Sequence, residues 1–227
     1  MVGTMTGFLG GEYLPVGLEM NFVEAPLNAL LDALAAIVGR TRRRVSEPMP
    51  VAEAVAWVLP FEGRWSRELV FSCGAWTAYL NNGMGGGDIT ARAPAAAKRL
   101  DVRCVSAMHA PMRPPGHAAT QLWIQSPDGV PPLMYRRTLG ATAADGWWQW
   151  DDWGDPLPFE DTTRYAARRI ADRFDRLALL TYLGALEIPI EDESAWGPAT
   201  VVQYRAWRIR RPVAGAVETA RRTYFGE

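Results

Sequence analysis

Between residues 68 and 153 the chain carries a series of short segments rich in β-branched and aromatic residues. They span residues 68–73, 76–80, 102–108, 119–125, 133–139 and 147–153. Turn signals separate several of them, namely Asn82-Gly83, Pro127-Asp128-Gly129 and Asp145-Gly146, and such sequences favour tight reversals between strands. Consecutive short strands joined by tight turns predict an antiparallel sheet.

Segments with helical patterns flank and interrupt these strands. Leucines and other apolar residues at helical spacing follow Pro26, and Gly39 can end the helix that they predict over residues 27–38. Further helices are predicted over residues 51–58, 94–100, 161–186 and 213–224, with a closing strand over 201–209. The expected fold class is therefore α+β, with a mostly antiparallel sheet and helices packed on one face.

The length of 227 residues is sufficient to bury one sizeable core without disulfides or metals. No internal repeat, low-complexity tract or convincing linker divides the chain, and residues 40–50 are the best candidate boundary. We therefore expect a single α+β domain over residues 1–227, with residues 1–60 as a candidate helical subregion.

The balance of charge excludes several classes of partner. With 24 basic and 25 acidic residues the net charge is −1, so no overall field attracts nucleic acid or an anionic membrane. Lys98 is the sole lysine, and such an excess of arginine over lysine indicates codon bias in a GC-rich bacterial genome. No window is long and apolar enough to span a bilayer, and two cysteines make no secreted disulfide framework. We expect a cytoplasmic protein with no membrane partner and no nucleic-acid partner.

The most distinctive stretch combines four of the ten tryptophans with three aspartates between residues 147 and 155. In a strand, Trp148, Trp150 and Asp152 would share one face, and Trp147, Asp151 and Trp153 the other. Exposed tryptophans beside carboxylates suit an anchor for a basic protein partner or a stacked carbohydrate ring. In the alternative interpretation the rings fill the core and the aspartates belong to a solvated turn. The expected partner-binding residues are Trp147, Trp148, Trp150, Asp151, Asp152, Trp153 and Asp155.

Cys73 is the leading candidate for a thiol nucleophile, with His109 or His117 as its base. Cys73 lies in an apolar, strand-like run, where a free cysteine usually acts as a small buried hydrophobe. Two cysteines and two histidines could bind zinc by number, yet no C-x-x-C or H-x-x-x-H spacing is present. We therefore predict no catalytic residue, no metal site and no cofactor.

A glycine-rich segment, from Asn82 to Asp88, lies where a phosphate-binding loop would be found. It lacks both the Gly-x-Gly-x-x-Gly spacing and a Gly-Lys-Ser/Thr sequence, so a turn is the favoured interpretation. Arginines also recur at helical spacing between Arg164 and Arg176, interspersed with acids. They predict a solvated, salt-bridged helix face rather than a nucleic-acid groove.

Two blocks of sequence resemble an uncharacterised bacterial family with many actinobacterial members. The first is Trp76-Thr77-Ala78-Tyr79-Leu80-Asn81-Asn82-Gly83, and the second runs from Pro156-Leu157-Pro158-Phe159-Glu160 through Arg164-Tyr165 to Asp172-Arg173-Phe174. The resemblance covers roughly residues 65–197, and the segment from Met84 to Gly87 departs from it. It implies a compact α+β protein encoded near contact or secreted toxins, with an immunity-type role and no transferable catalytic residue.

These observations lead to three functional hypotheses. We expect a non-enzymatic bacterial protein that binds a partner protein, with the neutralisation of a toxin as its specific role. One alternative is a cysteine-dependent hydrolase or transferase that uses Cys73 and His109. The other alternative is a structural subunit of a phage or secretion assembly.

Overall fold

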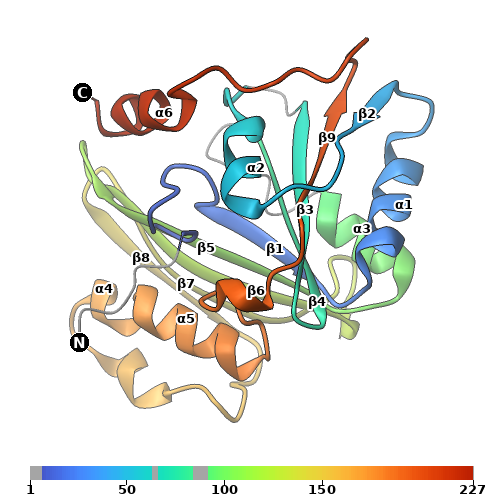
Figure 1. Cartoon of the computed structure of the whole chain (residues 1–227). Coiled ribbons are helices and arrows are strands. Elements are labelled where there is room, and N and C mark those ends of the chain that lie inside the picture. The colour runs from blue at the N-terminus through green and yellow to red at the C-terminus, as the bar shows by residue number, and fades with distance from the viewer. Residues whose placement is uncertain (1–6, 63–65, 84–91, 227) are drawn as a thin grey trace.

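In the computed structural model, nine antiparallel strands form one open sheet in the order β2-β9-β3-β4-β1-β5-β6-β7-β8 (Figure 1). The structure describes residues 7–62, 66–83 and 92–226. The strands are β1 Glu19–Val23, β2 Arg43–Val45, β3 Arg67–Cys73, β4 Trp76–Asn81, β5 Cys104–Arg113, β6 His117–Val130, β7 Tyr135–Ala144, β8 Trp147–Trp153 and β9 Thr200–Tyr204. The predicted α+β class with a mostly antiparallel sheet is thereby confirmed.

The helices agree with the predicted segments in most cases. They are α1 Leu27–Val38, α2 Val51–Val58, α3 Arg92–Leu100, α4 Ile170–Arg173, α5 Arg176–Ala185 and α6 Ala216–Phe225, with 3-10 turns η1 Thr162–Ala166 and η2 Glu193–Ala195. The predicted bounds of α1 and α2 are correct, because in each case a proline marks the start and an apolar stripe fills the helix.

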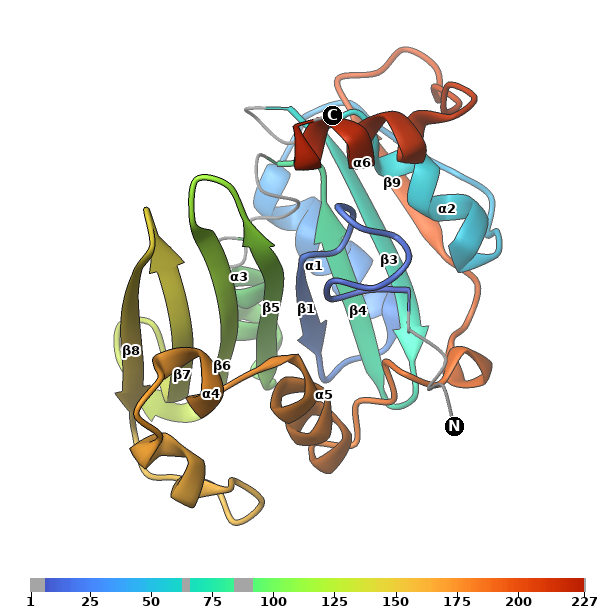
Figure 2. The same ribbon diagram turned by 90° about the vertical axis from the view of Figure 1, so that its left-hand side faces the viewer.

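The helices cover both faces of the sheet, which corrects the expectation that they pack on one. Adjacent residues of β1 mark the two sides: Phe22 belongs to a core cluster with α2 and α5, and Val23 to a cluster with α1 and α3. Figure 2 shows α1 and α3 behind the sheet and α5 in front of it. The central strands are buried on both faces, so their apolar residues do not alternate with polar ones and the sequence pattern cannot assign a face.

The strand β1 was not predicted, although it lies near the middle of the sheet between β4 and β5. All five of its residues pair with β5, where Asn21 lies opposite Ser106. Its last three residues also pair with β4, where Asn21 lies opposite Tyr79. The N-terminal residues therefore contribute a central strand as well as helices. A segment this short, buried on both faces, has no periodicity that distinguishes it from a loop.

The single helix predicted over residues 161–186 is broken into η1, α4 and α5. Ala167 and Phe174 adopt extended backbone angles between these elements, and Phe174 is buried in the core. Asp175 then begins α5 by accepting a hydrogen bond from the backbone N–H of Ala178 at 2.8 Å. Burial of the Phe174 ring and a new N-cap thus outweigh the helical propensity of the segment.

A buried polar network joins α3 to the sheet. The Glu68 carboxylate, with no exposed side-chain surface, is paired with the Arg92 guanidinium. It also accepts hydrogen bonds from the hydroxyls of Tyr79 at 2.9 Å and Tyr204 at 2.7 Å. Asn81 donates to Tyr79 in turn. A buried carboxylate is stable only when it is paired and hydrogen-bonded, so these partners depend on one another.

Replacing Arg92 with Leu is expected to lower the free energy of unfolding by about 3–5 kcal/mol, because the variant leaves Glu68 buried without its cation. Urea unfolding monitored by tryptophan fluorescence measures this change. Arg99→Leu, at an exposed position of the same helix, is the matched control and should shift stability by less than about 0.5 kcal/mol. Equal stability of the two variants would contradict the role of the network.

Candidate functional site

The tryptophan-rich strand β8 is the edge of the sheet next to β7. Trp148 and Trp150 are half-buried and pack against the core, whereas Trp147 is 81% and Trp153 is 44% exposed. The predicted alternation of side chains along this strand is therefore present. Trp147 and Trp153 face outward six residues apart, which corresponds to about 20 Å along a strand.

The inward-facing residues of β8 contact β7 and the segment that follows β8. The ring of Trp150 lies 5.2 Å from that of Tyr165, and the Arg173 guanidinium lies 5.8 Å from the Trp150 ring. Asp152 accepts a hydrogen bond from Nη1 of Arg137 at 2.6 Å. Of the expected partner-binding residues, Trp148, Trp150 and Asp152 thus make internal contacts. Trp147, Asp151, Trp153 and Asp155 are exposed, and the Asp152 side chain also retains 35% of its accessible surface.

Arg137, on β7, is the largest fully buried side chain of the described residues. Its Nε and Nη2 donate to the Glu160 carboxylate, with the shortest contact at 2.6 Å. Its Nη1 donates to Asp152 and to the backbone carbonyls of Trp153 at 3.0 Å and Gly154 at 2.8 Å. The guanidinium therefore ties the end of β8 and the following segment to β7.

The Glu160 carboxylate completes this cluster. It accepts hydrogen bonds from the Leu157 backbone N–H at 2.9 Å and from the Tyr165 hydroxyl at 2.7 Å. Burial alone would raise the pKa of Glu160, but the hydrogen bonds and the positive charge of Arg137 outweigh it and lower that pKa. Glu160 is therefore held ionised as a structural counter-ion.

A concavity of about 450 Å³ opens on the outward side of β6, β7 and β8. Strand pairing aligns Trp153 with Thr138 and Thr138 with Trp123, so the side chains of three strands meet there. We call it the outer concavity; it is lined by Trp123, Val130, Pro131, Pro132, Leu133, Tyr135, Thr138, Asp151 and Trp153. Sequence reasoning found Asp151 and Trp153 but missed the residues that β6, the β6–β7 turn and β7 contribute.

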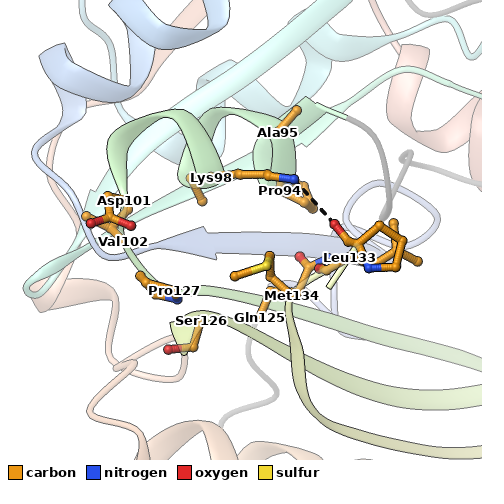
Figure 3. A pocket seen from close by; sticks show the side chains of 12 residues that line it. Pro94, Ala95, Lys98, Asp101, Val102, Gln125, Ser126, Pro127, Leu133 and Met134 are labelled. Carbon is orange, nitrogen blue, oxygen red and sulfur yellow. Dashed lines mark hydrogen bonds between the residues drawn. The ribbon is translucent and has the colours of Figure 1, made fainter. Parts of the chain in front are cut away.

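The turn after β6, residues 131–134, is supported from the side of α3. A smaller depression of about 210 Å³ lies between α3 and this turn (Figure 3). Across it, Lys98 donates to the Pro132 carbonyl at 3.3 Å, and the Gln125 amide donates to the Leu133 carbonyl at 3.1 Å. Pro132 and Leu133 line both hollows, so these bonds hold one wall of the outer concavity in place.

The structure does not bring Cys73 and His109 together. Cys73 pairs with Trp76 at one end of β3, and the backbone N–H of His109 bonds to the Leu18 carbonyl beyond the opposite end of β1. From the strand spacings the two residues are on the order of 20 Å apart. They form no nucleophile–base pair in this fold.

The environments of these residues also differ from those of a thiol and its base. Burial, with a smaller contribution from Asp192, raises the pKa of Cys73 to about 12. Burial and the neighbouring Arg176 lower the pKa of His109 to about 4, and its Nδ1 lies 3.0 Å from the Thr120 hydroxyl. Cys73 is therefore a protonated thiol at neutral pH, and His109 a neutral imidazole.

The remaining sequence candidates take no part in a described site. Residues 84–88 of the glycine-rich segment lie outside the described residues. Within residues 7–62, 66–83 and 92–226, no cluster of three or more His, Cys, Asp or Glu side chains is arranged to hold a metal ion. In those same ranges, no helix has the length and apolar character to cross a membrane.

Comparison of the chain with protein-family models, with curated proteins and with solved structures gave no match.

Both cysteines should resist an aromatic disulfide reagent at neutral pH in the folded protein, because Cys73 and Cys104 are buried and free. Spectrophotometric titration should detect both thiols only after urea is added. Cys73→Ala supplies the control and should release one thiol on unfolding. Rapid, stoichiometric labelling of Cys73 in the folded protein would contradict this prediction and restore a thiol-dependent activity.

Glu160→Gln should lower the free energy of unfolding at pH 7 by about 3–5 kcal/mol, because Arg137 loses its buried counter-ion. The folded-state pKa of Glu160 lies below its ordinary value of 4.5. Its stabilising contribution is therefore present above about pH 4.5 and lost as the pH falls through the lower folded-state value.

Urea unfolding between about pH 5 and pH 3 checks this dependence. Stability should fall less steeply with decreasing pH in Glu160→Gln than in the wild type. Glu218→Gln, which removes an exposed partner of Arg222, should retain the wild-type slope. An unchanged slope in Glu160→Gln would show that the carboxylate is not the titrating group.

Proposed function

We propose that the protein acts without catalysis, by binding a partner protein through the outer concavity. The observation that carries this proposal is the position of Trp153 and Asp151 at an exposed, largely apolar hollow. Val130 and Leu133, each 57% exposed, extend the apolar surface beside Trp153. Clusters of exposed apolar side chains with a polar edge are typical of protein-interaction sites.

The chemistry of the hollow favours a partner that presents a basic side chain beside apolar groups. Trp153, Trp123 and Tyr135 offer rigid aromatic surface at a low cost in side-chain entropy, as binding hot spots require. Asp151, within the lining, and Asp155, close to it in the chain, can orient a cation and accelerate encounter. Trp147 would contact a larger partner at the far end of the same strand.

The neutralisation of a toxin is the specific role that we propose, because the resemblance of the two sequence blocks implies it. In this role the outer concavity would bind the toxin and block its active surface, and no reaction would be needed. A subunit of a phage or secretion assembly is the competing proposal. It would bind copies of itself or of other assembly proteins, so the oligomeric state of the pure protein distinguishes the two.

Trp153→Ala should abolish recovery of the partner when the tagged protein is isolated from its source cell, and with purified partner should weaken binding tenfold or more. Asp151→Asn should weaken binding less and make it less sensitive to salt. Affinity measurement by calorimetry at two salt concentrations checks both results.

Trp207→Ala is the matched control, because Trp207 is 78% exposed and follows β9, next to the other edge of the sheet. This variant should bind the partner like the wild type. Full retention of the same partner by folded Trp153→Ala would refute the outer concavity as the binding surface. Discrete homo-oligomers of the wild type in light scattering, with no partner recovered, would favour the assembly role.

A further inference from the structure

The largest of the described hollows lies under the C-terminal helix α6. It has a volume of about 700 Å³ and is lined by Pro15, Leu18, Leu59, Pro60, Phe61, Arg113, Val213, Ala214, Ala216, Thr219, Ala220, Thr223 and Tyr224. Arg113 belongs to the end of β5 that joins β6, whereas the outer concavity adjoins the β6–β7 turn at the opposite end of these strands. The two hollows are therefore separate sites.

The packing of α6 leaves room for a ligand. No residue of this helix is fully buried, although Ala216, Val217 and Ala220 rest against the core. A helix that covers a core normally packs an apolar stripe against it. An apolar molecule beneath α6 would supply the contacts that the helix does not make with the protein.

Arg113 is the single ionisable cation in this apolar lining. Its guanidinium lies 4.8 Å from the centroid of the Tyr224 ring. Among the described residues, no carboxylate lies within ion-pair distance of Arg113. A cation at the edge of an apolar cavity attracts an anionic group and positions it for charge-assisted hydrogen bonds.

The hydroxyl of Tyr224 is buried beside this cation. Arg113 can donate to its oxygen, but no described residue accepts its proton. A buried donor without an acceptor is costly, and such groups commonly mark a site for a ligand or a water molecule. An anion held by Arg113 could accept this proton as well. The two adjacent donors suit the anionic head of a ligand, and the apolar residues of the lining suit its apolar tail.

We propose that the cavity under α6 binds a medium-chain fatty carboxylate. The carboxylate accepts hydrogen bonds from Arg113 and Tyr224, and the alkyl chain lies against Leu59, Phe61 and Ala220. The volume falls within the range of about 300–1,000 Å³ that is usual for small-molecule sites. A nucleotide or sugar would need more polar partners than this lining offers, and a cationic amphiphile would be repelled by Arg113.

Calorimetric titration of the full chain with decanoate, below its micelle concentration, tests the proposal. Decanoate should bind, whereas butyrate, which lacks the tail, should bind at least tenfold more weakly. Decanol should bind with an affinity that does not depend on Arg113. Absence of decanoate binding to the wild type would overturn the proposal.

Three variants locate the ligand. Arg113→Gln should weaken decanoate binding at least tenfold, Tyr224→Phe should weaken it several-fold, and Ala220→Trp, which fills the cavity, should abolish it. Arg221→Gln removes an exposed cation from the same helix and should leave binding unchanged. Circular dichroism verifies that each variant is folded. Equal affinity in Arg113→Gln, Ala220→Trp and the wild type would show that decanoate binds elsewhere and would refute the site.

Discussion

Burial of the Arg137 guanidinium is the constraint on which the outer half of the sheet depends. A cation without solvent contact is tolerated only if every donor finds an acceptor, and here Glu160, Asp152 and two backbone carbonyls supply them. These acceptors come from β8 and from the segment that follows it. Satisfying one side chain of β7 therefore fixes the edge strand and the start of the helical connection together, and with them the outward direction of Trp153.

The Glu68 network likewise surrounds one buried ion with hydrogen-bonding partners, but here the central ion is an anion. There a buried carboxylate gathers Arg92 from α3 and hydroxyls from β4 and β9. The Glu68 network joins a covering helix to strands that are distant in sequence, whereas the Arg137 network joins β7 to the next strand, β8, and to the segment that follows it. Hydrophobic contact holds these layers together without specifying one arrangement, whereas the directional bonds to a buried ion are satisfied in only one.

The sequence predicted the elements that carry a local signal. The alternation of tryptophan and aspartate in β8 correctly separated Trp150 from Trp153, and Pro26 and the leucine stripe located α1. The strand β1 and the break at Phe174 depend on tertiary contacts instead, since each is set by burial between distant segments. The outer concavity was only half predicted, because Trp123 and Tyr135 reach Trp153 through the register of β6, β7 and β8. Local patterns cannot specify that register.

Two sequence blocks, residues 76–83 and 156–174, supply side chains to these buried networks. Tyr79 and Asn81 of the first block belong to the Glu68 cluster, and Glu160 and Tyr165 of the second bind at the Arg137 cluster. The outward residues of β8 and the β6–β7 turn lie outside both blocks. They can therefore vary without breaking a buried ion pair, which is the property required of a surface that distinguishes one partner from another.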